Sequence, residues 1–279
     1  MSKAHATSVH WFSLVKYLTY GLLLANVYLF LQEELGSLVH TSTGSLSLTD
    51  FVQVFAQTID TAAWVILLLL FELETSILDD EQLTPGITRL IHGTRLVCGA
   101  AIVWAFLGYG AELTTLYSTY ALDAWDACSH VAEQWSILLR LDDYEPLTAT
   151  NCASLGDTLA RVSDYRVVAQ PEGLRITRQL AWADFINSGT WILVVLLLEI
   201  EVRLQESGRL SNTLMRGALK VKYLLYGILF AAAVYWGFEG KFLDFWDASL
   251  WLFAFIFIEL NIFDWQQSSE ASLINQTAS

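Results

Sequence analysis

The sequence lacks the residue patterns on which most enzyme sites are built. Its five histidines show no metal-ligand spacing, and it contains no Ser/His/Asp arrangement, phosphate-binding loop or dinucleotide-binding fingerprint. We therefore expect no metal site and no cofactor, and enzyme chemistry has no positive support. Basic side chains are also few, because 15 Lys and Arg stand against 29 Asp and Glu. With a net charge of −14 and no basic patch, nucleic acid is not an expected partner.

The sequence also contains little proline, and more than half of its residues are apolar. Only three prolines occur, 54% of the residues are apolar and the mean hydropathy is +0.45. Six apolar segments approach the ~20 residues that a helix needs to cross ~30 Å of hydrocarbon. They cover residues 12–31, 52–72, 95–116, 181–200, 221–238 and 245–263. The composition thus predicts an all-α integral membrane protein with six transmembrane helices, and the lipid bilayer is its first expected partner.

The few basic residues predict the orientation of these helices. Nine of them fall on one side: Lys3, Lys16, Arg89, Arg95, Arg203, Arg209, Arg216, Lys220 and Lys222. The short loops of the other side, 32–50 and 239–244, hold only Lys241. Since Lys and Arg are retained on the cytoplasmic side, both termini are expected in the cytoplasm. No sorting signal is evident, so the plasma (inner) membrane is the expected location.

About sixty residues between the third and fourth apolar segments predict a small external domain, 118–180. Apolar residues from Trp125 to Leu139 recur at three-to-four spacing, which predicts an amphipathic helix. Further on, 165–169 and 174–178 flank Gln170-Pro171-Glu172-Gly173, which predicts a β-hairpin. The expected insertion is therefore α+β. Cys128 and Cys152 both fall in it and are expected to form a disulfide, whereas Cys98 lies in a span and should stay reduced.

One spacing of residues occurs three times along the chain. It consists of Asp or Asn, Trp four residues later, Glu eight residues after the Trp, and Glu or Asn two residues after that. The copies are Asp60-Trp64-Glu72-Glu74, Asn187-Trp191-Glu199-Glu201 and Asp247-Trp251-Glu259-Asn261. We interpret them as three diverged two-helix repeats. The resulting divisions are 1–94 (first repeat and cytoplasmic connection), 95–117 (third helix), 118–180, 181–220 (fourth helix and connection), 221–265 (third repeat) and 266–279 (disordered cytoplasmic tail).

The acidic layer of this pattern, Glu72, Glu199 and Glu259, allows two interpretations. Three carboxylates around a pseudo-threefold axis would attract and pass cations. Alternatively, each acid pairs with a base at the start of a neighbouring helix, giving Lys16 with Glu72, Arg95 with Glu199 and Lys222 with Glu259 as interfacial anchors. The second layer, Asp60, Asn187 and Asp247, suits either a pathway or interhelical hydrogen bonds. The tryptophans one turn further are expected to pack or to donate hydrogen bonds.

Two hypotheses for function follow from these patterns. The first is a cation channel or transporter lined by the repeated acidic residues. The second is a noncatalytic membrane subunit or scaffold, whose external domain docks another membrane or periplasmic protein through Trp125 and Trp135. A membrane enzyme is a distant third. Flux that depends on the acids would favour the first hypothesis, and stoichiometric copurification the second.

Overall fold

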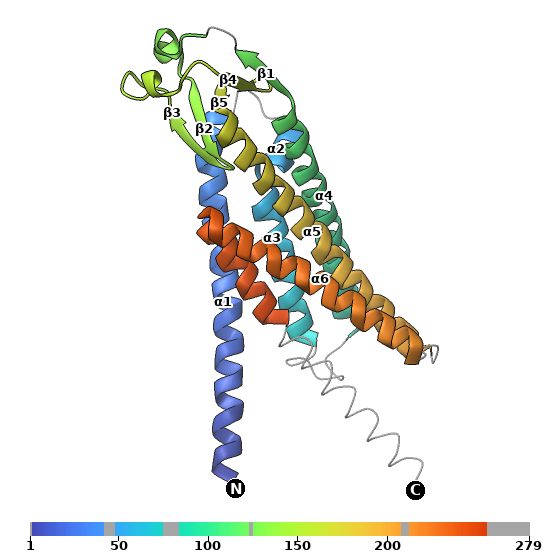
Figure 1. The fold of residues 1–279 in the computed structure, drawn as a ribbon. Coiled ribbons are helices and arrows are strands. Elements are labelled where there is room, and N and C mark those ends of the chain that lie inside the picture. The colour runs from blue at the N-terminus through green and yellow to red at the C-terminus, as the bar shows by residue number, and fades with distance from the viewer. Residues whose placement is uncertain (1, 42–47, 75–83, 123–124, 208–211, 256–279) are drawn as a thin grey trace, which may run out of the picture. The chain divides into compact units, whose positions relative to one another are not determined.

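The structure is a computed structural model that describes residues 2–41, 48–74, 84–122, 125–207 and 212–255. It is mostly helical, with one small mixed sheet (Figure 1). The chain forms two compact units: Met1–Asn26 with Tyr226–Ser279, and Val27–Leu225. Each unit is treated by itself below. The predicted tail, 266–279, lies outside the described residues.

Among the described residues, four helices are long and apolar enough to cross a membrane, where the sequence predicted six. They are α1 (Ser2–Thr41), α4 (Pro85–Tyr117), α5 (Pro171–Glu206) and α6 (Asn212–Glu239). The second predicted span is interrupted at Phe55, whose backbone has φ −106° and ψ 25°, so that it becomes α2 (Leu48–Val54) and the 17-residue α3 (Ala56–Glu72). The sixth predicted span is helical over 242–255, and its remaining residues lie outside the described part of the chain.

Prolines mark helix starts where the sequence predicted turns. Thr84 is the N-cap of α4, and Pro85 occupies its first turn, where a missing N–H costs nothing. Pro171 likewise begins α5, and Glu172 in its first turn complements the helix dipole. The predicted hairpin around Pro171 is therefore wrong, because 174–178 belongs to α5. The predicted loop 32–50 is also mostly helical, since α1 continues to Thr41 and α2 begins at Leu48.

Residues 118–170, here called the sheet domain, form a five-stranded sheet. The strands are β1 (Thr119–Leu122), β2 (Ser136–Arg140), β3 (Asp143–Pro146), β4 (Leu159–Val162) and β5 (Val167–Ala169). Their order is β1-β4-β5-β2-β3, and only β2 and β5 run parallel. The predicted amphipathic helix is wrong. Its residues form the 3-10 helix η3 (Ala127–Glu133) and then β2, in which Ser136, Ile137 and Leu138 are buried and Leu139 is exposed.

The core of the sheet domain lies under the strands and is closed by a disulfide. Ile137 and Val168 pack with residues of the second 3-10 helix, η4 (Cys152–Ser154), and with Leu155. The predicted Cys128–Cys152 bridge is present, with Cα atoms 5.0 Å apart, and Cys98 is free and buried in α4. The disulfide that the sequence predicted thus joins the two 3-10 helices of the sheet domain.

Below the sheet domain, α3 packs against α4 and α4 packs against α5, with α2 on α4 (Figure 1). Gly108 makes this packing possible, because a Cβ at that position would lie 2.8 Å from the Val52 carbonyl oxygen of α2. Gly189 of α5 similarly faces the Phe106 ring at 3.1 Å. The residues around Gly108 therefore serve helix packing.

The other unit contains the N-terminal part of α1, the end of α6 and helix 242–255. Gly240, with φ +78°, ends α6 in the left-handed conformation that glycine adopts without steric cost. The amide of Lys241 then donates to the Trp236 carbonyl at 3.0 Å, closing the turn. In this unit Asn26 of α1 donates to Asp247 at 2.7 Å, which ties two helices together.

Candidate functional site

Two acids of the repeated pattern are bound by bases from the following helix. Glu74, just after α3, forms an ion pair with Arg95 of α4. Glu201 of α5 pairs with Lys222 of α6 at 2.6 Å. In both pairs the base follows the acid by the same 21 residues. Arg95 therefore pairs with Glu74 instead of the expected Glu199, and Lys222 pairs with Glu201, while its expected partner Glu259 lies outside the described residues.

The first acids of the pattern have different surroundings. Glu199 is more than half exposed and pairs with Arg203 one turn along its own helix at 2.6 Å, so it does not meet Arg95. Glu72 is buried at the end of α3. Lys16 is buried in the other unit, with its ammonium 5.0 Å from the Tyr17 ring centre. Glu259 lies outside the described residues. Among the described residues the first acids are thus Glu72, which is buried, and Glu199, which is exposed.

Asp60 is a buried acid of the pattern that lies within the helix packing. Only 8% of its surface is exposed, on the side of α3 that meets α4 and α5. The Ser188 hydroxyl of α5 donates to Oδ2 at 3.4 Å, and the Tyr109 hydroxyl of α4 lies beside the carboxyl group. The Trp64 indole lies beside the group, but its N–H is not aligned to donate. Oδ1 has no hydrogen-bond partner in the described part of the chain.

The other members of the same layer are bound differently. Asn187 is half-buried, and its amide oxygen also has no partner within the described ranges. Asp247 accepts the hydrogen bond from Asn26 noted above. Trp191 and Trp251 are both buried, as expected for packing residues. Asp60 is thus the member of the layer that combines a carboxyl group, burial and an unpartnered oxygen.

A further buried acid, Glu34 of α1, holds the start of α3. Phe55 supplies no side-chain cap there. Instead one Glu34 oxygen accepts from the backbone N–H groups of Gln57 at 2.9 Å and Thr58 at 3.2 Å, and the other accepts from the Thr58 hydroxyl. These contacts satisfy N–H groups that a helix start otherwise leaves open, and a negative charge suits that position. Glu34 is therefore a structural cap from another helix.

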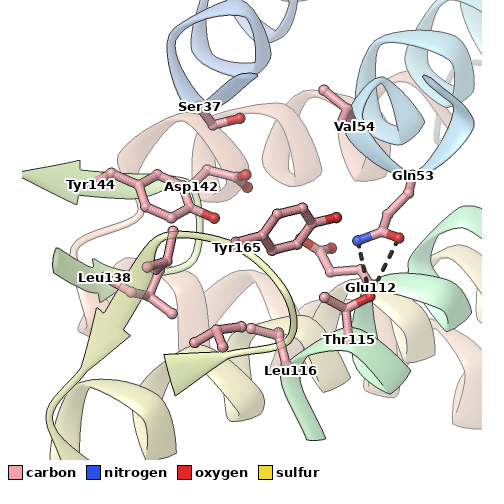
Figure 2. A pocket seen from close by; sticks show the side chains of 12 residues that line it. Ser37, Gln53, Val54, Glu112, Thr115, Leu116, Leu138, Asp142, Tyr144 and Tyr165 are labelled. Carbon is pink, nitrogen blue, oxygen red and sulfur yellow. Dashed lines mark hydrogen bonds between the residues drawn. The ribbon is translucent and has the colours of Figure 1, made fainter. Parts of the chain in front are cut away.

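A polar cavity of about 50 Å³ lies where the helices meet the sheet domain (Figure 2). Its polar lining comes from α1, α2, α4 and the sheet domain: Ser37, Gln53, Glu112, Thr115, Asp142, Tyr144 and Tyr165. Gln53 and Thr115 are hydrogen-bonded to each other at 3.3 Å. Tyr144 stacks on His40, with ring centres 5.5 Å apart. Burial, and then the negative charge of Asp142, raises the pKa of Tyr144 well above the usual value of 10.

The cavity and the Asp60 site share one face of α4. Tyr109, which lies beside Asp60, is one helical turn before Glu112, which lines the cavity. On α5 the buried Asp184 likewise lies one turn before Ser188, on the side nearer the sheet domain. Polar side chains thus continue from the cavity into the helix packing.

These residues form no recognisable metal centre: within the described ranges no group of three His, Cys, Asp or Glu side chains is placed to hold an ion. Comparison with protein families, with curated protein sequences and with solved structures gives no match. The class that the fold supports is a mostly helical membrane protein with four candidate spans and a small disulfide-closed sheet domain.

Sequence reasoning found Asp60 but missed the residues around it. Ser188 stands next to the selected Asn187, and a one-residue offset of this kind follows from how two helices rotate against each other. Tyr109 lies in the apolar segment 95–116 and belongs to none of the patterns described above. Glu34 could have been found from one feature of the sequence, because it is an acidic residue at the end of an apolar segment.

Proposed function

We propose that this chain is an integral membrane protein that translocates a cation, and that Asp60 is the residue that binds it. The observation that carries the proposal is the Asp60 carboxyl group, buried between α3, α4 and α5 with one oxygen unpartnered. An ionisable side chain inside a membrane-spanning bundle is costly and is by default a functional candidate. A group needed only for packing would have both oxygens satisfied.

Access to Asp60 is proposed from the sheet-domain end. Tyr109 contacts Asp60, and Glu112, one turn further along α4, lines the polar cavity. Acidic groups at the mouth of such a site raise the local concentration of cations. The cavity is therefore the proposed entrance.

Toward the other end, the same face of α3 is closed by apolar side chains. Trp64 and the buried Leu68 lie between Asp60 and Glu72. Twelve residues of helix span about 18 Å, a distance that no ion crosses through packed apolar groups without movement. This supports a gated transporter over an open channel.

The acidic layer proposed from the sequence has a different role in this proposal. Glu74 and Glu201 are neutralised by Arg95 and Lys222, as expected for anchors between adjacent helices. Their identical spacing supports an internal repeat of α3–α4 and α5–α6, with the ion pair as its common feature. A three-copy repeat also requires Glu259 and Asn261, which lie outside the described residues.

The orientation is proposed from charge and from the disulfide. Basic residues gather at the ends of the helices away from the sheet domain, including Arg95, Arg203 and Lys222, and these ends are assigned to the cytoplasm. A disulfide persists in an oxidising compartment, which agrees with a sheet domain outside the cytoplasm. Together they support the plasma membrane of a prokaryote as the location.

The test measures cation flux across the membrane of liposomes that contain the purified full-length chain. Asp60→Asn keeps the size of the side chain and removes its charge, so it should abolish flux while the protein still elutes and melts as the unchanged chain does. Glu199→Gln is the matched control, because Glu199 is exposed and lies on the same repeated pattern. Flux equal in all three proteins would refute the role of Asp60.

A second candidate function is a noncatalytic subunit that docks a partner through the sheet domain. Its support is the firm connection of that domain to the helices: α5 begins two residues after β5, and Arg178 of α5 donates to the Leu116 carbonyl at 3.0 Å and lies over the Tyr117 ring. Trp125 and Trp135, the docking residues expected from the sequence, are partly buried against the domain core. Stoichiometric copurification from native membranes, with no flux, would favour this function.

A further inference from the structure

We infer that the cation bound at Asp60 is a proton, passed between Asp60 and the polar cavity through the hydroxyl of Tyr109. This inference rests on the proposed function and names its substrate. It follows from the chemistry of the groups around the carboxyl, from the unpartnered Oδ1 and from the position of Tyr109.

The surroundings of Asp60 do not suit a metal cation. Hard cations such as Ca²⁺ and Mg²⁺ take about six to eight oxygen ligands, mostly from carboxylates and carbonyls. Here the polar neighbours are two hydroxyl groups, Ser188 and Tyr109, and the indole N–H of Trp64, which has no lone pair to offer. A single carboxylate surrounded by hydrogen-bond donors provides too few ligands for a metal ion, because the donor groups point their hydrogen atoms toward the position that the ion would occupy.

The same surroundings suit a proton. A protonated carboxyl group presents an O–H on one oxygen and an acceptor on the other. Ser188 donates to Oδ2, so Oδ1 is the position left for the proton. In the protonated state the buried group carries no charge, which avoids the cost of an unpaired charge in apolar surroundings.

Tyr109 provides the connection to the cavity. A phenol hydroxyl accepts one hydrogen bond while it donates another, so it exchanges protons without a net change. In the transfer, the Glu112 carboxyl gives its proton to the Tyr109 oxygen as Tyr109 gives its own to Asp60. One proton thereby moves from Glu112 to Asp60, Tyr109 ends neutral, and Glu112 is left as a carboxylate facing the cavity. Two further acids lie on this side: Asp142, which lines the cavity, and Asp184, one turn from Ser188 on α5.

The experiment measures proton and metal-cation fluxes on the same liposomes. A trapped pH-sensitive dye reports protons, and separate trapped dyes report Na⁺, K⁺ and Ca²⁺, each under an imposed gradient. The proteins are the unchanged chain, Asp60→Asn, Tyr109→Phe and Glu199→Gln. We expect proton flux in the unchanged chain and the control, a loss of at least about a hundredfold in Asp60→Asn, and a smaller loss in Tyr109→Phe, since a positioned proton-transfer group contributes about 10²–10⁴-fold.

A second readout does not depend on transport. Infrared spectra of the unchanged chain should contain the C=O band of a protonated carboxyl group that is absent from Asp60→Asn and present in Glu199→Gln. Flux of Na⁺, K⁺ or Ca²⁺ that depends on Asp60, without proton flux, would overturn the inference that the bound cation is a proton. It would leave the proposed function standing. Absence of every flux would overturn both. A Tyr109→Phe protein with unchanged proton flux would overturn the relay.

Discussion

The ammonium of Lys222 on α6 lies 2.6 Å from a carboxylate oxygen of Glu201 on α5, and both side chains are only about one-fifth exposed (19% and 21%). The pair therefore sits largely out of water. Glu199 and Arg203, two residues away on either side, form a pair of the same length that is 56% and 75% exposed. α5 thus takes part in two ion pairs that have the same N–O distance but differ in solvent exposure.

This contrast predicts different coupling energies for the two pairs. Glu201→Gln alone leaves the largely buried Lys222 without a counter-charge, whereas Glu201→Gln combined with Lys222→Met leaves no unpaired charge. We expect a coupling free energy of about 1 to 3 kcal/mol for Glu201 and Lys222 in thermal unfolding in detergent. The exposed Glu199 and Arg203 should give about 0.3 to 0.5 kcal/mol. Equal coupling in both cycles would contradict the role of burial.

Gly108 provides a second prediction, about helix packing. In Gly108→Ala the new Cβ would lie 2.8 Å from the Val52 carbonyl oxygen, so α2 must move away from α4. Forcing a methyl group into a packed contact costs about 1 to 3 kcal/mol, which should lower the melting temperature.

The matched control for this change is Gly99→Ala on the same helix. Gly99 has open space where a Cβ would stand, and alanine favours helix by about 1 kcal/mol over glycine. The control should melt at the same temperature or slightly higher. Similar destabilisation by both changes would mean that α2 does not pack on Gly108.

The sequence predicted elements well where one signal dominates and poorly where tertiary contacts decide. The apolar segments around α1, α4, α5 and α6 were recognised because burial in lipid needs a long apolar run. The helix expected from Trp125 to Leu139 was wrong because three-to-four spacing over a short segment also fits a 3-10 turn followed by a strand with one inward face.

The site was predictable only in part, for a geometric reason. Asp60 could be selected as an acid in an apolar segment, but its partners Tyr109 and Ser188 lie 49 and 128 residues away in sequence. Which residue of α5 faces α3 depends on the rotation of one helix against another, and a difference of one residue turns the side chain by about 100°. The partner of Arg95 could not be predicted for a similar reason, since Glu74, just after α3, and not the expected Glu199 of α5 forms the ion pair with it.

Tyr144 predicts an alkaline limit for the sheet domain. Its native pKa is raised above the unfolded value of about 10 by burial and by Asp142, so the neutral phenol stabilises the fold. That contribution is fully present below pH 10 and is lost as pH rises through the native pKa. Tyr144→Phe should therefore lose less stability between neutral and strongly alkaline pH, as followed by tryptophan fluorescence. Tyr120→Phe, where the ring is 58% exposed, should behave as the unchanged chain, and identical curves for all three would contradict the shift.

The disulfide gives a prediction about the stability of the same domain. Cys128 and Cys152 are 24 residues apart in sequence, and in the chain-entropy model a loop of that size contributes about 3 kcal/mol. Replacing both by serine should lower the stability of the sheet domain by that amount and leave the helical content unchanged in far-UV circular dichroism. Mass spectrometry of unreduced peptides checks the bridge itself, and free thiols at both positions in oxidised protein would disprove it.

The last prediction concerns which side of the membrane each end occupies. Asp157 is exposed in the sheet domain, and Ser207 is exposed just after α5. In a Cys98→Ala background that keeps the disulfide, a membrane-impermeant thiol reagent should label Asp157→Cys in intact cells and label Ser207→Cys only after permeabilisation. The physical reason is that Arg203 and the other bases near Ser207 hold that end in the cytoplasm, whereas the bridge requires an oxidising side for the sheet domain. Detection of the Cys128–Cys152 peptide in each variant controls for mispaired thiols. Labelling of Ser207→Cys alone in intact cells would invert the topology, and with it the side from which the polar cavity supplies Asp60.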